Sequence, residues 1–436
     1  MNRPVTVIGA GFSGLTTAYF LVKRGCQVRI CEKSDRAGGL IETLQTEHGL
    51  VEKAANGILS SAKLEAIAAD ADVPLLTTRR EGRKRFIYRG QPRQLPLNFF
   101  DLLKTGVRVS THAMRWSPRP FESISAWGRR VGGSAATDYL LIPALGGIYA
   151  GDPDRLSASL IFGKAKLPDH LRTNKPQKGK LHGTVAPPQG MQQLTDGLRA
   201  WLEQAGAEFV FHADSADTGA RDPVAICLSA DAAAEYLREA APEISQALSG
   251  IQMLSLVTVT AFYPGDRCSS PSVIEGVLET GDALADDRAT VPCARLNGFG
   301  CLFPRDQGFR ARGVLFNNSI FEGRGPAHSE SWIFGGALDP DVMELSDDQF
   351  AGLIATERQR FYGKRDEPLA LYINRRRNAI PHYTIELERT LTNLPAPPAN
   401  IVLVGNYLGR IGLAKLIERA AVAAERTALT PGLSAA

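Results

Sequence analysis

Cysteine and histidine are scarce in this sequence, and neither is spaced to hold a metal ion. The 436 residues include 6 Cys and 7 His, and no two cysteines form a C-x-x-C pair. Isolated cysteines in a chain of this length are typical of reduced thiols in a reducing compartment. We also find no Ser–His–Asp arrangement for nucleophilic catalysis. The sequence therefore predicts no metal site and no hydrolytic triad, and it favours a cytoplasmic location.

The sequence also lacks a strong charge bias and a long apolar run. Its 50 Lys and Arg residues against 46 Asp and Glu residues leave a net charge of +4, which is too small to indicate a nucleic-acid partner. No stretch reaches the roughly 20 consecutive apolar residues of a membrane-spanning helix. Any membrane contact is therefore expected to be peripheral, on the cytoplasmic membrane. The apolar residues around Leu95–Leu103 are the candidate interfacial helix.

A strand, a glycine-rich turn, a helix and a second strand open the chain. Val5–Ile8 is a β-branched run of the kind found in buried parallel strands. The segment Gly9-Ala10-Gly11-Phe12-Ser13-Gly14 follows it, and an apolar-periodic helix is expected from about Leu15 to Lys23. A second strand at Gln27–Cys31 ends at Glu32. This order predicts a Rossmann-like dinucleotide-binding unit.

Each residue of this unit has a physical task in binding a dinucleotide. Gly9 permits the tight turn, Gly11 lets the backbone approach a pyrophosphate, and Gly14 lets the helix pack closely on the strand. The helix N-terminus offers free N–H groups and a positive dipole end to the phosphates. Glu32 can accept hydrogen bonds from ribose hydroxyls. We predict that these residues, together with Ser13, bind the cofactor.

The residues after Glu32 distinguish one dinucleotide from another. The segment Glu32-Lys33-Ser34-Asp35-Arg36-Ala37-Gly38-Gly39 resembles the E-x-x-x-R-x-G-G extension of amine-oxidase-type flavoproteins. In those proteins the arginine and the paired glycines line an elongated FAD site. The resemblance implies FAD as the cofactor, with Lys33, Arg36, Gly38 and Gly39 among the residues that bind it.

A second strand–turn–helix unit lies near the end of the chain. Ile401–Val404 is fully apolar and is therefore expected in the same parallel sheet as the first strand. Gly405-Asn406-Tyr407 follows, and a helix is expected from about Leu413 to Arg426. The N-terminus of this helix would stabilise negative charge on the flavin. We predict that Gly405, Asn406 and Ile411 contact the cofactor.

Several motifs in the middle of the chain resemble those of protoporphyrinogen oxidases, and they occur in the order found in that family. Between them they cover nearly the whole sequence. The matching segments are Arg85–Gly90 with Leu95-Pro96, Gly147–Pro153 with Leu156-Ser157, Gly298–Pro304, Gly335–Ala337 with Asp339-Pro340, Ala379–Tyr383, and Gly405–Tyr407. The Tyr149-Ala150-Gly151-Asp152-Pro153 loop is the most specific of them, because general amine oxidases do not share it.

The resemblance implies oxidation of protoporphyrinogen IX to protoporphyrin IX with oxygen as the acceptor, in haem or chlorophyll synthesis. The flavin carries the chemistry, so no catalytic side chain is predicted. The protein has to hold a flat apolar tetrapyrrole and anchor its propionates. By resemblance Arg85 is the anchor, Gly151 lets the backbone approach the macrocycle, and Leu302 and Phe334 are apolar walls.

The expected fold is α/β. A discontinuous Rossmann-like FAD-binding domain is combined with a mixed-sheet substrate domain and a helical subdomain, in agreement with a length that exceeds one hydrophobic core. The FAD-binding parts are expected at residues 1–82, 181–232 and 394–436. The substrate domain is expected at 83–97 and 233–393, and the helical subdomain at 98–180.

The chain also departs from the family pattern, which leaves two alternatives open. Arg410 stands where the family usually has glycine, Glu208–Ser229 is short for a second FAD segment, and about Asp266–Leu296 reads as an insertion. A flavoprotein that binds a tetrapyrrole or a partner without turnover would tolerate an arginine beside the flavin. A coproporphyrinogen oxidase would need further cations, which Arg375–Arg377 could supply. The sequence does not indicate the oligomeric state.

Overall fold

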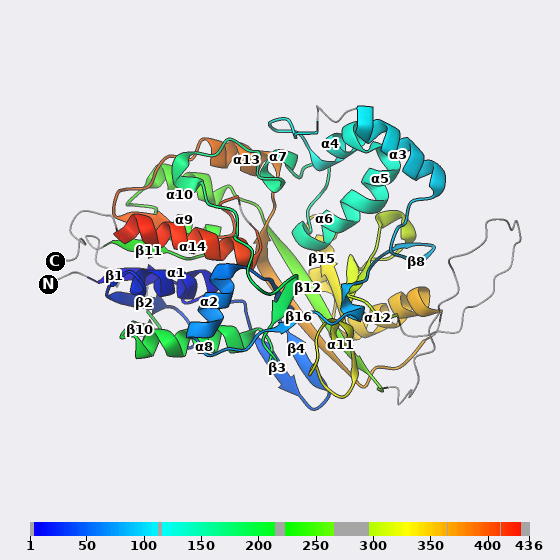
Figure 1. The fold of residues 1–436 in the computed structure, drawn as a ribbon, viewed down its shortest axis with the longest axis horizontal. Helices are drawn as coiled ribbons and strands as arrows, with labels where there is room; N and C mark the ends of the chain where they lie inside the picture. Colours follow the sequence, from blue (N-terminus) through cyan, green and yellow to red (C-terminus); the bar gives the residue numbers. More distant parts are fainter. Residues whose placement is uncertain are drawn as a thin grey trace, which may run out of the picture.

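The computed structural model describes residues 4–111, 116–213, 223–265, 296–363, 365–409 and 411–428. Two large sheets organise these residues, and a group of helices lies at the end of the molecule away from the smaller of the two (Figure 1). The predicted insertion falls almost wholly outside the described residues, and so does Arg410. The predicted α/β fold class, with a Rossmann-like unit and a mixed sheet, is confirmed.

A parallel five-stranded sheet forms the nucleotide-binding part. Its order is β10 (Glu208–Phe211), β2 (Val28–Glu32), β1 (Val5–Ile8), β11 (Val224–Ile226) and β17 (Ile401–Leu403). Every pair of neighbours is parallel, as expected for apolar strands that are covered on both faces. Helix α1 (Phe12–Val22) packs against α14 (Leu413–Ala428), so the first and last helices lie side by side (Figure 1).

Two small sheets and two helices complete this part. The hairpin of β3 (Thr43–Thr46) and β4 (Gly49–Glu52) follows the first βαβ unit. The short strands β5 (Ile58–Leu59) and β6 (Leu76–Thr77) pair with β9 (Thr184–Ala186). Helices α2 (Ala62–Asp70) and α8 (Gln192–Gln204) contact each other beside them.

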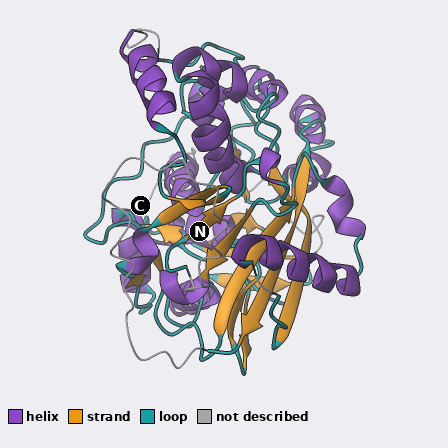
Figure 2. Ribbon diagram, turned by 90° about the vertical axis from the view of Figure 1, so that its right-hand side faces the viewer, coloured by secondary structure: helices purple, strands orange, loops and turns teal. Residues whose placement is uncertain are grey.

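A mixed seven-stranded sheet crosses the middle of the molecule (Figures 1 and 2). Its order is β16 (Ala370–Pro381), β12 (Met253–Tyr263), β15 (His328–Gly335), β14 (Gly313–Phe316), β13 (Gly300–Leu302), β7 (Arg85–Arg89) and β8 (Gln91–Arg93). One face buries an aromatic core that includes Phe303, Trp332 and Phe361. The side chains on the other face are half-buried, and Asn374 at one end of this face contacts Lys53 of the nucleotide-binding part; we call it the open face below.

Helices cover the remaining surfaces. Those of residues 98–161 are α3 (Phe99–Thr111), α4 (Ile124–Val131), α5 (Gly133–Ala136), α6 (Ile142–Tyr149) and α7 (Ala158–Ile161), with a turn of π-helix at Thr137–Leu141. The later ones are α9 (Ala230–Tyr236), α10 (Pro242–Ser249), α11 (Asn317–Ile320), α12 (Asp347–Tyr362) and α13 (Ile385–Thr392).

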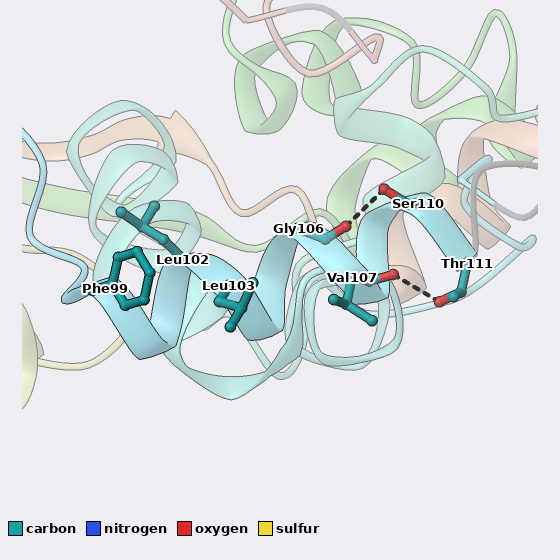
Figure 3. Close-up of a pocket in the computed structure, with 7 residues that line it drawn as sticks. All are labelled: Phe99, Leu102, Leu103, Gly106, Val107, Ser110 and Thr111. Atoms are coloured by element: carbon teal, nitrogen blue, oxygen red, sulfur yellow. Dashed lines mark hydrogen bonds between the residues drawn. The ribbon is translucent and has the colours of Figure 1, made fainter.

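Helix α3 buries none of its side chains. Phe99 is 73% exposed, Phe100 70% and Val107 57%. Phe99 and Val107, together with Leu102, Leu103 and the small residues beside them, line an open hollow of about 600 Å³ along the helix (Figure 3). The hydroxyls of Ser110 and Thr111 in this hollow donate to backbone oxygens of the same helix. None of the helices in the described part of the chain is long and apolar enough to span a membrane.

Candidate cofactor and substrate site

The two predicted halves of the cofactor site meet at one edge of the parallel sheet. Ile8 of β1 lies opposite Ile226 of β11, which in turn lies opposite Leu403 of β17. The turns that follow β1 and β17 therefore leave the sheet at the same edge, two strand spacings or about 10 Å apart. Ligands of open α/β sheets bind at this carboxyl edge.

The glycine-rich turn is closed by backbone contacts that exclude larger residues. A Cβ atom at Gly14 would lie 1.7 Å from the carbonyl oxygen of Gly9, so helix α1 can pack this closely only with glycine. Gly38 bridges to Gly11, and both Gly38 (φ +109°) and Gly39 (φ +60°) have left-handed backbones. At Gly11 a Cβ atom would meet only the Cα of Gly39, at 3.8 Å. Gly11 is therefore not required by packing, which fits a role in ligand approach.

The N-terminus of α1 is left without a side-chain cap. Gly11 is the N-cap residue and no side chain of the described residues donates or accepts there. Glu32 lies beside it and is fixed by three donors: the backbone N–H of Ala10 at 2.7 Å, and the N–H and hydroxyl of Ser34 at 3.0 and 2.8 Å. A carboxylate has about four lone-pair positions, so one remains for a ribose hydroxyl. Free helix N–H groups beside a fixed acid fit the phosphate–ribose end of a dinucleotide.

Arg36 holds the loop that contains Gly38 and Gly39. Its guanidinium donates to the carbonyl oxygens of Gly39 at 2.6 Å and of Ala37 and Ile41 at 3.2 Å each. Its first role in the structure is therefore to hold the Gly38–Gly39 loop in shape. Lys33 is exposed to solvent beside Glu32.

The carboxy-terminal turn is held by Tyr383, which lies just beyond the end of β16. The hydroxyl of Tyr383 donates to the carbonyl oxygen of Asn406, and a Cβ atom at Gly405 would collide with the ring of Tyr407 at 2.2 Å. Ile411 is buried in the core below this turn. Gly405 and Asn406 thus lie at the carboxyl edge of the parallel sheet, whereas Ile411 is turned into the protein core, and their contacts with the cofactor stay predictions.

The substrate-binding prediction concerns the open face of the seven-stranded sheet. Strand register places one row of side chains on that face: Ile87, Leu302, Gly313, Ile333, Thr258 and Asn374. Their neighbours along each strand, such as Phe86, Cys301 and Trp332, are buried in the aromatic core on the other face. The amide of Asn374 donates to the carbonyl oxygen of Lys53. This end of the row therefore abuts the nucleotide-binding part.

Arg85 and Leu302 share this face. Arg85 lies opposite Gly300, is exposed, and stacks its guanidinium 4.4 Å from the ring centre of Phe299. Leu302 packs against α6, because a Cβ atom at Gly147 would lie 2.8 Å from its Cδ2. The predicted loop of residues 147–152 thus begins directly over Leu302.

Gly151 is required by the packing of the loop itself. A Cβ atom there would lie 2.5 Å from Cδ2 of Leu156 and 3.0 Å from Cδ2 of His382. Local packing is therefore sufficient to explain the glycine at this position. The approach of its backbone to a macrocycle stays a prediction.

Phe334 does not lie on the open face. Its side chain is fully buried in the aromatic core and packs edge to face against Phe350, at 5.7 Å between ring centres. Side chains alternate along a strand, so the preceding residue, Ile333, points to the open face opposite Gly313. The structure thus moves the candidate wall from Phe334 to Ile333. The alternation of Trp332 and Phe334 in the sequence is the signal that indicates this.

The three arginines at 375–377 are divided by the same alternation. Arg375 pairs with Asp347 at 2.8 Å on the core side, and Arg377 pairs with Glu344 at 3.4 Å. Only Arg376 turns to the nucleotide-binding part, where it pairs with Glu42 at 3.2 Å. Burial opposes ionisation of Glu42, but the nearby charges of Lys53, Arg36 and Arg376 outweigh it and lower its pKa. All three arginines therefore already have acidic partners.

Two adjacent residues that sequence reasoning left without a role connect the two halves of the site. His382 accepts a hydrogen bond from the backbone N–H of Asp152, at 3.1 Å, and so holds the 147–152 loop. Its neighbour Tyr383 holds Asn406 and also packs against Tyr149, at 5.2 Å between ring centres. Burial, with Arg155 nearby, lowers the pKa of His382 to about 4.

Comparisons with known proteins agree with this geometry. Residues 7–71 match the NAD(P)-binding Rossmann-like domain. The chloroplastic protoporphyrinogen oxidase of Nicotiana tabacum is 24% identical over 95% of this chain and 83% of its own length. The protoporphyrinogen oxidase of Homo sapiens is 23% identical over 88% of this chain and 89% of its own.

Solved structures show the same fold. A putrescine oxidase superposes with a TM-score of 0.68 at 16% identity, over 98% of both chains. The cyclohexylamine oxidase of Brevibacterium oxydans gives 0.68 at 14% identity, over 98% of this chain and 99% of its own. These matches confirm the resemblance to protoporphyrinogen oxidases and the prediction of FAD as the cofactor. The chain is a distant homologue of the protoporphyrinogen oxidases, with a Rossmann-like dinucleotide-binding domain and the fold of FAD-dependent amine-oxidase-type enzymes.

Proposed function

We propose that the protein oxidises protoporphyrinogen IX to protoporphyrin IX, with FAD as the cofactor and oxygen as the acceptor. The observation that carries the proposal is the row of side chains on the open face of the seven-stranded sheet, in which Ile87, Leu302 and Ile333 are apolar. Its Asn374 end abuts the nucleotide-binding part and its other end carries Arg85. A flat apolar substrate with an acidic edge suits such a surface. The names of the homologues support a porphyrinogen as that substrate.

The residues of the chain would bind and orient both molecules. FAD supplies a hydride acceptor when it is bound. The free N–H groups of α1 and the carboxylate of Glu32 would hold its phosphates and ribose, and the Gly405–Asn406 turn would meet its other end. Arg85 would fix a propionate, because a guanidinium binds a carboxylate through two parallel hydrogen bonds. Leu302 and Ile333 would contact the macrocycle and keep water away from it.

The alternative of a coproporphyrinogen oxidase was motivated by Arg375–Arg377, and the ion pairs of these three residues remove that support. The alternative of a binding protein without turnover was motivated by Arg410, which lies outside the described residues. No observation at these positions supports either alternative. Protoporphyrinogen IX therefore stays the substrate that we propose.

We further propose that helix α3 is the peripheral membrane contact. Its apolar side chains are exposed along one open hollow (Figure 3). Lys104 and Arg108 lie on the same helix. An amphipathic helix with basic residues at its polar side binds the interface of anionic membranes. A substrate as apolar as a porphyrinogen would be met most often at such a surface.

The proposed reaction is tested by aerobic incubation of the flavin-loaded protein with protoporphyrinogen IX, followed by porphyrin fluorescence. We expect fluorescence to appear at a rate proportional to the amount of bound flavin, above the rate with the heat-denatured chain. Putrescine and cyclohexylamine, assayed in parallel, should leave the flavin oxidised. Turnover of an amine without turnover of the porphyrinogen would contradict the proposal.

A further inference from the structure

A basic segment leads directly into the strand that carries the proposed anchor Arg85. Residues 79–85 contain five arginines and lysines and a single acid, Glu81. Their net charge of +4 equals the net charge of the whole chain, so the remaining residues together are neutral. The net positive charge of the molecule is therefore contributed by one short segment that ends at β7.

Most of the charges in this basic segment lack an acidic partner. Arg79 is ion-paired to Glu81, at 2.8 Å. The other four basic residues are exposed, and they form no ion pair with any residue that the structure describes. The contrast is with Arg375–Arg377, where each arginine is paired with an acid. The basic segment therefore presents unneutralised charge to the solvent.

Neutral neighbours hold the basic segment in place. A turn of 3-10 helix at Glu81–Arg83 contacts α11, whose sequence carries no charge. A Cβ atom at Gly82 would lie 2.4 Å from the carbonyl oxygen of Ser319, so the turn packs closely on this helix. The carbonyl oxygen of Lys84 accepts a hydrogen bond of 2.7 Å from the backbone N–H of Phe299. The fold thus fixes the place of these charges through contacts that do not neutralise them.

Strand β7 connects the basic segment with the open face. Arg85 and Ile87 share one side of the strand, and Ile87 lies opposite Leu302. A chain spans at most about 3.6 Å per residue, so the Cα atoms of Arg80 and Arg85 are within about 18 Å of each other. The Debye length is about 30 Å at 0.01 M salt and about 8 Å at 0.15 M salt. A carboxylate that approaches Arg85 is therefore attracted by the whole segment at low ionic strength and by its nearest charges alone at high ionic strength.

We propose that the basic segment steers the anionic substrate to the open face. The inference rests on the proposed function, because it takes a porphyrinogen with two ionised propionates as the ligand. Charges of one sign beside a binding surface raise the association rate of an oppositely charged ligand by about tenfold to thousandfold, and salt removes this gain. Charges at the rim of a site act mainly on association. Arg80, Arg83 and Lys84 therefore speed the encounter, and Arg85 holds the bound substrate.

Attraction to an anionic membrane is the competing explanation for the basic segment. The proposed membrane contact, α3, has its own basic residues, Lys104 and Arg108. The basic segment instead leads into the strand of the anchor, which favours a role toward the substrate. The two explanations differ in what the charges change, which is the rate of substrate association in one and vesicle binding in the other.

The test is stopped-flow association of protoporphyrin IX with the full-length, flavin-loaded protein, in a neutral detergent that keeps the porphyrin monomeric. We expect the wild-type association rate to fall by about tenfold between 0.01 M and 0.15 M salt. The triple variant Arg80→Gln, Arg83→Gln and Lys84→Gln should associate about tenfold more slowly than the wild type at 0.01 M salt, and less than about threefold more slowly at 0.15 M salt. Its dissociation rate should be unchanged.

Two controls isolate the place and the sign of the charge. The variant Arg24→Gln, Lys166→Gln and Arg365→Gln removes the same net charge from exposed positions on other elements, and it should associate as fast as the wild type. The dimethyl ester of protoporphyrin carries no charge. Its association should therefore be equally fast with the wild type and with the triple variant of the basic segment, at both salt concentrations.

The outcomes separate this inference from the proposed function. Unchanged association of protoporphyrin with the triple variant at low salt, or an equal slowing with the ester, would overturn the steering role while the proposed function stands. Loss of vesicle binding without slower association would overturn it as well and assign the basic segment to the membrane. A wild-type protein that binds neither porphyrin would overturn both. If the triple variant does not fold, the wild type decides, because salt must slow its association with protoporphyrin and not with the ester.

Discussion

His382 and Asp152 are joined by a hydrogen bond that only an unprotonated nitrogen can accept. The backbone N–H of Asp152 donates to Nε2 of His382 at 3.1 Å, and Nδ1 of the same ring lies 3.1 Å from the side-chain oxygen of Gln252. The imidazole is therefore neutral, with its proton on Nδ1. Since the adjacent Tyr383 holds Asn406, one dipeptide connects the loop over the substrate face with the cofactor turn.

The neutral state of His382 predicts how stability depends on pH. The pKa of this group is about 4 in the folded protein against 6.5 ordinarily, so the unfolded chain takes up the proton first as the pH falls. Stability is complete above about pH 6.5 and is lost as the pH falls toward 4, by about 2 kcal/mol between pH 8 and pH 5. Denaturant unfolding at both pH values measures this.

The variant His382→Gln should show a smaller loss between these two pH values, because a glutamine oxygen can accept the same bond but does not titrate. The exposed His182, changed to Gln, is the matched control and should leave the pH dependence as in the wild type. An identical pH dependence in His382→Gln and the wild type would show that His382 does not hold the loop in this way.

The cofactor site predicts opposite results for two glycines. Gly11→Val should fold and melt normally without FAD, because a Cβ atom there meets only Gly39, at 3.8 Å. It should nevertheless lose FAD binding, because the side chain would occupy the place of the pyrophosphate. Gly14→Ala should fail to fold normally, because its Cβ would lie 1.7 Å from the carbonyl oxygen of Gly9. Flavin absorbance and thermal melting provide the two measurements.

Gly352→Val is the control for these substitutions, since no atom lies within 4 Å of a Cβ atom at that position. It should retain both the fold and the flavin. Full FAD occupancy in Gly11→Val would mean that the glycine-rich turn does not bind the pyrophosphate.

Removal of the proposed anchor Arg85 is expected to lower porphyrinogen turnover without loss of bound flavin. A charge-assisted hydrogen bond contributes about 1.5–3 kcal/mol, so Arg85→Ala should lower kcat/KM on the porphyrinogen by about tenfold to hundredfold. Arg85→Lys should recover only part of this loss. The nearby exposed Arg83, changed to Ala, should have little effect. Unchanged turnover in Arg85→Ala, or activity lost only in proportion to lost FAD, would refute the anchor.

The exposed helix α3 predicts binding to lipid vesicles. The double variant Phe99→Ser with Leu103→Ser removes side chains that are 73% and 55% exposed, and it should lower the fraction that sediments with phosphatidylglycerol vesicles several-fold or more. The matched control replaces Leu59 and Leu369, which are 62% and 51% exposed elsewhere. Equal sedimentation of the two variants would exclude α3 as the specific contact.

The sequence was most informative where local chemistry decides the structure. The glycine-rich turn, the acid at the end of β2 and the apolar strand before Gly405 each depend on a few neighbouring residues, and they predicted the parallel sheet and the edge at which the two turns meet. The open face of the second sheet was harder to predict. A motif that ends in Ile-Phe-Gly does not say which of the two apolar residues faces the core, and only the packing of Phe334 on Phe350 settles it.

Ion pairing was the least predictable feature. Arg375–Arg377 looked available in the sequence, yet each arginine has found an acid contributed by another segment of the chain. Arg312 drew no attention, and its lack of an acidic partner among the described residues is visible only in three dimensions. Both outcomes depend on contacts between segments that are distant along the chain, which local patterns do not specify.

The central claim is flavin-dependent oxidation of a porphyrinogen by oxygen, and its most direct test is a stoichiometry. Aerobic turnover of protoporphyrinogen IX removes six electrons for each porphyrin formed, so the account predicts three molecules of hydrogen peroxide for each molecule of protoporphyrin. Peroxide and porphyrin fluorescence are measured in the same sample, at limiting substrate. A porphyrin yield that is no greater with the flavin-loaded protein than with the heat-denatured chain, or that appears without peroxide, would contradict the account.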